Sequence, residues 1–172
     1  DTDWLVHEAR ALAREIARAQ GGDVRIVGGA ADAVRIARDE PERQVVMLAV
    51  GFETTACTTA AAILADPPDN FSLLMSHRLV PPALEALLGA GDLPIAGLLL
   101  PGHVTTVMGT AEYEVLAARH GASMAVAGFE PLDVLSGILA LVEAILEGAG
   151  EVRNAYRRVV RSEGNPRAVA AI

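Results

Sequence analysis

The sequence predicts an α/β protein: a mostly parallel sheet of about five strands with helices on both faces, in a Rossmann-like three-layer arrangement. Short apolar runs alternate along the chain with longer segments of helical periodicity. No Asn-Gly or similar hairpin signal joins two consecutive runs, which favours parallel strands linked by helices. Hydrophobic residues make up 52% of the chain and aromatic residues only 3%, so we expect a core of Ala, Val, Leu and Ile side chains.

The predicted strands are short β-branched or apolar runs next to turn-forming residues. The run at residues 45–50, Val-Val-Met-Leu-Ala-Val, is the clearest, because every position is apolar, as expected of a strand that is buried on both faces. Gly51 follows it directly and begins a short loop. The five predicted strands are residues 23–27, 45–50, 71–76, 95–100 and 123–127.

The predicted helices fill the intervals between these strands. Asp3 is a plausible N-cap for the first helix, and Gly21 and Gly22 end it. Pro131 stands in the first turn of the longest helix, where proline is well tolerated. The predicted helices are residues 4–20, 30–38, 54–65, 81–88, 111–119, 131–147 and 152–160, and a further one begins at residue 167.

The domain organisation follows from this pattern. We expect one α/β domain at residues 1–150 and a C-terminal helical segment at residues 151–172, which leads towards a region outside this chain. The chain starts on Asp1 rather than Met and stops within a helical pattern. We therefore expect part of a longer protein, and a trimmed protein would look the same.

Composition narrows the function. The net charge of −8 and the pI of about 4.9 argue against nucleic acid or an anionic membrane as a partner. The longest apolar runs are too short to span a membrane and no signal peptide is visible, so we expect a cytoplasmic protein. The single cysteine, Cys57, cannot form a disulfide within the chain or a complete cysteine-based metal site, and we predict no metal site.

Unusual polar groups follow four of the predicted strands, in the loops 51–55, 76–78, 101–106 and 128–131. Parallel strands bring their carboxyl ends to one edge of a sheet, where ligands bind, so we expect a shared site. His103, which follows Pro-Gly, is the best single candidate for a ligand or proton carrier. The candidates for catalysis are Glu53, Cys57, His103 and Glu130, and those for ligand binding are Gly51, Thr54, Thr55, His77, Gly102 and Thr105.

Several candidates also have a structural interpretation. Glu53 and Glu130 stand just before helices, where a carboxylate complements the helix dipole. Thr54 and Thr55 are common N-cap residues, although their hydroxyls could instead hold an anion. Cys57 near a helix N-terminus could be reactive, but a lone cysteine among Ala and Thr is more often a small packed residue. Walker, Gly-x-Gly-x-x-Gly and Gly-x-Ser-x-Gly motifs are absent.

Several ordered motifs resemble the hydrogenase maturation factor HypD, and the resemblance extends from about residue 21 to residue 172. The matching motifs are Gly51-Phe52-Glu53-Thr54-Thr55-Ala56; Ser76-His77 with Pro81-Pro82-Ala83; Pro101-Gly102-His103-Val104-Thr105 with Gly109 and Tyr113; Ala127-Gly128-Phe129-Glu130-Pro131-Leu132-Asp133; and Asn154-Ala155-Tyr156-Arg157-Arg158-Val159-Val160 with Gly164-Asn165.

The resemblance implies an assembly scaffold rather than an enzyme. This central portion would form one wall of a cleft in which the Fe(CN)2CO centre of nickel–iron hydrogenase is assembled with HypC-like and HypE-like partners. Glu53, Thr54, Thr55, His103 and Glu130 would line that wall and provide hydrogen bonds or handle protons. The resemblance implies iron and an iron–sulfur cluster of the 4Fe-4S type for the full-length family. No cofactor is expected in this chain, which lacks the family's Cys-Gly-Gly-His motif and cluster cysteines.

Two departures keep other interpretations open. The family has Pro where this chain has Cys57, and Ser where it has Thr105. The alternative is a stand-alone small-molecule or anion-binding α/β enzyme that uses Cys57 as its nucleophile. A third hypothesis is an inert domain that docks a partner through the predicted helix around Tyr156.

Overall fold

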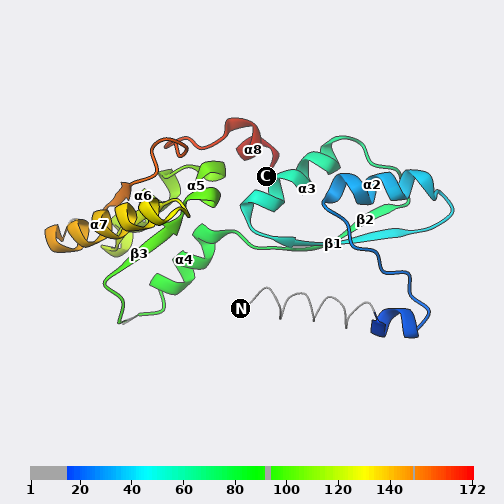
Figure 1. Ribbon diagram of the computed structural model, residues 1–172, viewed down its shortest axis with the longest axis horizontal. Helices are drawn as coiled ribbons and strands as arrows, with labels where there is room; N and C mark the ends of the chain where they lie inside the picture. Colours follow the sequence, from blue (N-terminus) through cyan, green and yellow to red (C-terminus); the bar gives the residue numbers. More distant parts are fainter. Residues whose placement is uncertain (1–14, 92–93, 149) are drawn as a thin grey trace.

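The computed structural model describes residues 15–91, 94–148 and 150–172 and shows an α/β fold, as predicted (Figure 1). Five parallel strands are present, but they form two sheets, β1-β2 and β3-β4-β5. The elements are α2 (Ala30–Asp39), β1 (Val45–Gly51), α3 (Glu53–Leu64), β2 (Phe71–His77), α4 (Val80–Leu88), β3 (Gly97–Pro101), α5 (Gly102–Met108), α6 (Ala111–His120), β4 (Ser123–Ala127), α7 (Pro131–Glu147), β5 (Val152–Asn154) and α8 (Pro166–Ala171). Among the described residues, no helix has the length and hydropathy that a membrane crossing requires.

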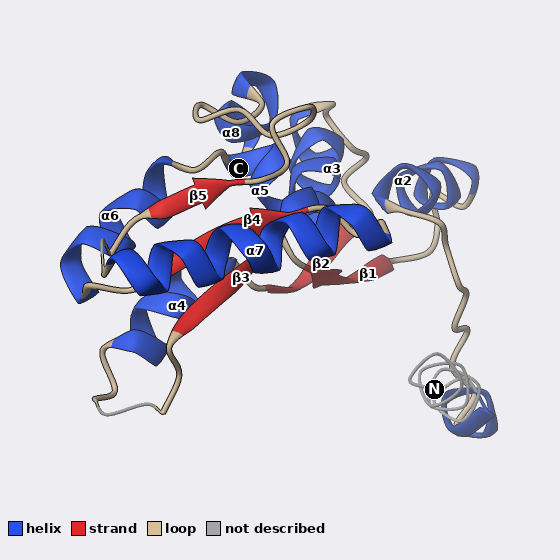
Figure 2. Ribbon diagram, turned by 60° about the vertical axis from the view of Figure 1, so that its left-hand side comes forward, coloured by secondary structure: helices blue, strands red, loops and turns tan. Residues whose placement is uncertain are grey.

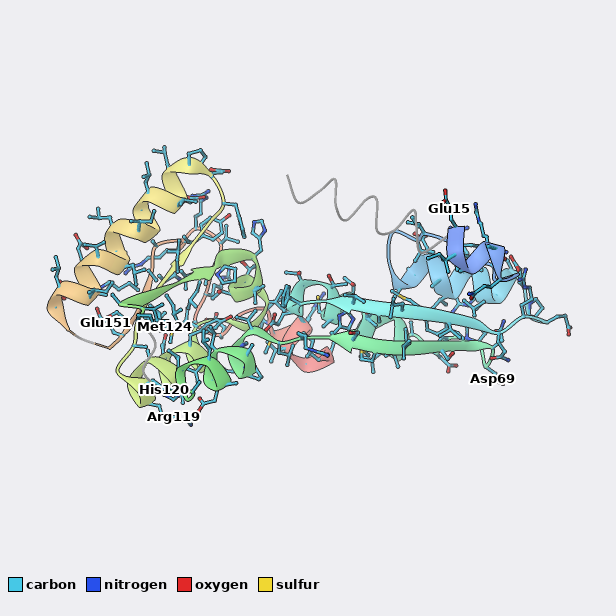
Figure 3. The ribbon with its side chains drawn as sticks, turned by 90° about the horizontal axis from the view of Figure 1, so that it is seen from below. Glu15, Asp69, Arg119, His120, Met124 and Glu151 are labelled. Carbon is cyan, nitrogen blue, oxygen red and sulfur yellow. The ribbon has the colours of Figure 1, made fainter. Side chains whose placement is uncertain are left out.

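The two sheets lie one after the other along the long axis of the molecule (Figure 1). Helices α3, α5 and α8 contact one another between them. The β3-β4-β5 sheet is covered by α7 on one face, while α6 contacts β4 and β5 and packs against α4 (Figure 2). Figure 3 shows Met124 of β4 inside this unit, where it is fully buried. This half of the molecule therefore has the predicted three layers.

The β1-β2 sheet is covered on one face only. Its strands pair in register from Val45 opposite Phe71 to Gly51 opposite His77, and α2 and α3 pack against them. The alternate residues of β1 point away from these helices, and the side chains of Val46 and Leu48 are 63% and 62% exposed. The continuous apolar run that marked this strand in the sequence thus gives it a second apolar face, which no described element covers.

Three expectations were wrong or lie partly outside the described residues. Residues 23–27 form no strand; Arg25 instead pairs with Asp23 at 2.7 Å and with Glu40 at 2.5 Å. Residues 152–160 form no helix, because 152–154 pair with β4 as strand β5. The C-terminal segment expected to be helical therefore contains a strand as well as α8. Of the predicted first helix, only residues 15–20 are described, and residues 15–19 of these are helical.

Asn154 explains why the helix fails to form after β5. Its side-chain oxygen accepts a hydrogen bond from the backbone N–H of Tyr156 at 2.9 Å, and its amide donates to the carbonyl of Val160 at 3.0 Å. Such local side-chain bonds compete with the helical pattern of backbone bonds. The chain therefore turns at Asn154 and places the ring of Tyr156 against the main core.

The ring of Tyr156 requires glycine at two strand ends. A Cβ atom on Gly102 would lie 2.6 Å from Cδ1 of Tyr156 and 2.4 Å from the carbonyl oxygen of Ala127. A Cβ on Gly128 would lie 2.6 Å from Cε2 of the same ring. The glycine at residue 102, expected to admit a ligand, is thus required by the packing of the protein itself.

We expect Gly102→Ala to destabilise the fold by about 1–3 kcal/mol, because the carbonyl of Ala127 is backbone and cannot move aside cheaply. Urea unfolding followed by circular dichroism measures the change. Gly29→Ala is the matched control, since an added Cβ there meets no atom within 4 Å. Equal stability of the two variants would contradict the packing role of Gly102.

Candidate functional site

Glu53 lies inside the protein and not on an open wall. It is the first residue of α3, after the N-cap Phe52, and its side chain is fully buried. Its Oε1 accepts a hydrogen bond of 2.6 Å from the backbone N–H of Val80, the first residue of α4. Its Oε2 has no hydrogen-bond partner among the described residues. Gly-Phe-Glu occurs twice in the chain, at residues 51–53 and 128–130. The first of these triplets ties the end of β1 to the start of α4.

Tyr113 is a buried polar neighbour of this carboxylate, and the hydroxyl of Thr105 lies near enough to the phenol to lower its pKa. The phenol oxygen of Tyr113, on α6, has no hydrogen-bond partner among the described residues. Burial raises the pKa of Tyr113, and the negative charge of Glu53 raises this pKa further. Thr105 is also fully buried, and its hydroxyl donates to the carbonyl of Pro101 at 2.9 Å. Thr105, predicted to bind a ligand, thus already donates its hydroxyl to the last residue of β3.

His77 is used in the same internal way. Its Nδ1 lies 3.2 Å from the carbonyl oxygen of Gly51, and its Nε2 lies 3.1 Å from the hydroxyl of Thr59. A carbonyl can only accept, so Nδ1 carries the proton and Nε2 accepts from Thr59. Gly51 has φ +145°, and an added Cβ would lie 2.7 Å from the Thr55 side chain. Both ring nitrogens of His77 are engaged, and the imidazole joins β2 to β1 and α3.

Other predicted site residues are exposed to solvent, at the starts of α5 and α3. His103 is exposed at the start of α5, and its ring centroid lies 4.4 Å from that of Phe129, which is 63% exposed. Phe52 and the side chains of Thr54 and Thr55 are exposed at the start of α3. The two threonines lie within the helix and do not cap it. The sheets thus bring the predicted residues into two groups, one at the ends of β1 and β2 and one at the ends of β3 and β4.

Glu130 belongs to an ion-pair network at the start of α7. Its carboxylate lies 3.1 Å from Nη2 of Arg158, and the same guanidinium forms two hydrogen bonds to Asp133, one of them 2.6 Å long. Arg158 also lies over the ring of Tyr156, 4.7 Å from its centroid. Hydrogen bonding to Arg158 holds the pKa of Asp133 below its usual value. Sequence reasoning did not select Arg158, although it falls within one of the matching motifs.

Cys57 occupies the second turn of α3 and is partly exposed. Its thiol donates to the carbonyl of Thr54 at 3.3 Å. Across the described ranges, no three His, Cys, Asp or Glu side chains are grouped so that they could hold a metal ion. A 4Fe-4S cluster needs several thiolates and the chain has one cysteine, so these residues alone do not fit such a cluster.

Comparison with known proteins gives these loops a family context. Residues 6–172 match the model of the HypD family, described as "Hydrogenase formation hypA family". This chain belongs to the HypD family. The match includes the ends of all four strands that carry candidate residues.

Curated HypD relatives agree with this assignment. The chain is 45% identical to hydrogenase maturation factor HypD2 of Bradyrhizobium diazoefficiens over 88% of its own length and 42% of the relative. It is 44% identical to HypD of Cupriavidus necator, over 91% of this chain and 44% of that protein. It is 42% identical to HypD of Escherichia coli, over 91% of this chain and 43% of that protein. The chain thus spans less than half the length of these relatives.

The ion pair of Asp133 predicts a loss of stability in acid. A carboxylate whose pKa is lowered in the folded state stabilises the fold above its unfolded pKa, near 4, and loses that effect as the pH falls through the folded pKa. We expect Asp133→Asn to be less stable than the unchanged chain at pH 7, and this difference to shrink below about pH 4. Urea unfolding over a pH series measures it. A difference independent of pH would contradict the ion-pair explanation.

The surroundings of Cys57 predict ordinary thiol chemistry. We expect iodoacetamide to modify it no faster than the cysteine of a short unstructured peptide, because its thiol is partly covered and bonded to the Thr54 carbonyl. Mass spectrometry over time gives the rate, and Cys57→Ser is the blank. Modification many times faster than the peptide would support the nucleophile alternative.

Proposed function

We propose that this chain is the part of a HypD maturation scaffold that forms one wall of a cytoplasmic assembly site. At that site the Fe(CN)2CO centre of nickel–iron hydrogenase would be built with HypC-like and HypE-like partner proteins. Membership of the HypD family over residues 6–172 is the observation that carries this proposal. The relatives that bear the name hydrogenase maturation factor support it.

In this proposal, the chain positions its cargo and partner and does not ligate iron. The proposal treats iron as a substrate held by other groups, and the described side chains offer no cluster of three metal donors. The exposed imidazole of His103, stacked against Phe129, is the group of this wall that is best placed to donate a hydrogen bond or move a proton. Thr54 and Thr55 add exposed hydroxyls at the other sheet.

A partner surface fits the same end of the β3-β4-β5 sheet. Phe129 and Leu132 are 63% and 77% exposed where β4 passes into α7. Large exposed apolar side chains in one place mark protein interaction sites. The carboxylates beside them, Glu130 and Asp133, are both paired with Arg158. An apolar surface of a small partner could therefore dock here without meeting unpaired charge from these two residues.

We expect Leu132→Ser to weaken binding of a purified HypC-like partner about ten-fold, because it removes an apolar contact at the strand ends. Isothermal titration calorimetry measures the dissociation constant. Leu146→Ser is the matched control: it changes the same residue type on the same helix, with 81% exposure, at the opposite end of α7.

The two variants separate the outcomes. Weaker binding by Leu132→Ser alone supports docking at the strand ends. Equal weakening by both variants would indicate that the partner contacts the whole outer face of α7 and not the strand ends alone, which contradicts the proposed docking position. If the unchanged chain and a full-length HypD both failed to bind the partner, partner docking would be rejected.

A further inference from the structure

We infer that Glu53 and Tyr113 hold one buried water molecule between them, and that this bridge joins the two sheets. The inference concerns the interior of the protein and goes beyond the proposed docking and assembly roles. It does not depend on a HypC-like partner or on iron.

Two orphaned polar atoms are the first observation. Three buried side-chain atoms of the described residues have no hydrogen-bond partner: Oε2 of Glu53, Oε2 of Glu85 and the phenol oxygen of Tyr113. The carboxylate of Glu85 is accounted for by its ion pair with Arg119 at 2.9 Å, at the end of α6 (Figure 3). That leaves Glu53 and Tyr113, both with fully buried side chains. Buried polar groups are almost always hydrogen-bonded to protein or water.

The two groups lie in the same part of the interior. The bond from the Val80 N–H fixes the Glu53 carboxylate at the start of α4, and α4 packs against α6, which carries Tyr113. The charge of Glu53 also raises the pKa of the phenol, as expected of groups in the same part of the interior. Yet no direct hydrogen bond joins them. This part of the interior therefore holds a buried acceptor and a buried donor that both lack a partner.

A water molecule matches the hydrogen-bonding needs of these two groups. It can donate to Oε2 of Glu53 and accept from the hydroxyl of Tyr113, and a buried water needs two to four polar partners. The hydroxyl oxygen of Thr105, whose proton goes to the Pro101 carbonyl, is a third possible acceptor nearby. An anion would be repelled by the carboxylate, and the described residues offer no cluster of metal donors here.

The bridge would connect elements from both halves of the molecule. Glu53 follows β1 in the first sheet, whereas Tyr113 lies on α6, which packs against β4 and β5 of the second. Together with the bond to Val80, it would hold the β1–α3 connection against two helices of the other half. Tyr113 is therefore a positioning residue for Glu53.

Removal of the phenol oxygen tests this directly. We expect Tyr113→Phe to raise the equilibrium constant for unfolding about two- to ten-fold, because the water and Glu53 lose a partner. If the hydroxyl has no partner at all, the same variant removes a costly desolvated group and leaves stability unchanged or higher, which would overturn the inference. Tyr156→Phe is the matched control, since its hydroxyl is not among the buried unpaired atoms; we expect little change.

Titration of the phenol tests the pairing. The chain has two tyrosines, so in Tyr156→Phe the ultraviolet signal of tyrosinate reports Tyr113 alone. Replacement of Glu53 by Gln in that background should lower the pKa of Tyr113, because a negative charge beside the phenol is lost. Circular dichroism at each pH follows folding. An unchanged pKa would show that the two groups do not face each other.

A crystal structure of the unchanged chain tests the water itself. We expect one ordered water within hydrogen-bonding distance of both oxygens. A direct bond between Glu53 and Tyr113, or a dry gap, would overturn it. Because none of these readouts uses a partner protein, their failure can be distinguished from failure of the proposed function.

Discussion

The hydrogen bond between the buried carboxylate of Glu53 and the backbone N–H of Val80 is the contact on which the join between the two sheets depends. Burial of a carboxylate is costly unless hydrogen bonds replace its water. Glu53 begins α3, where the helix dipole favours negative charge, and Val80 begins α4, where an N–H has no helical partner. Each helix start thus supplies what the other lacks, and the end of β1 is fixed against α4.

The second Gly-Phe-Glu triplet shows that the same sequence can serve a different purpose. Glu130 also precedes a helix after a strand, but it is exposed and pairs with Arg158 from the C-terminal segment. The phenylalanines of both triplets are exposed. The repeat therefore predicts a position, at a strand end before a helix, but not burial. Burial depends on the element that meets the loop, α4 in the first case and the segment of Arg158 in the second.

Sequence patterns predicted those elements whose own residues determine them. The apolar runs at 45–50, 71–76 and 123–127 became β1, β2 and β4 within one residue at each end. The predictions of a strand at residues 23–27 and of a helix at residues 152–160 are wrong, because the structure of these segments depends on residues elsewhere in the chain. Strand β5 is only three residues long and forms because β4 offers its edge: the N–H of Met124 donates to the carbonyl of Glu151 at 2.9 Å. No local pattern of residues carries that information.

The sequence predicted the roles of the candidate site residues only in part, for the same reason. Residues of the right types were found at the strand ends, but their roles divide by exposure: His77 and Thr105 use their polar atoms inside the protein, while His103 faces outward. The groups that engage His77, Gly51 and Thr59, lie 26 and 18 residues away in the sequence, so no local pattern identifies them.

This division is consistent with the proposed role as a scaffold. A binding surface is accurate only if the elements beneath it are rigid. Here the strand ends are tied by His77 across β1 and β2, by Glu53 to α4, and by the Tyr156 ring packed against the ends of β3 and β4. The exposed pair of His103 and Phe129 rests on that frame. In the proposed role, rigid placement of these exposed groups is what this part of the HypD family would contribute.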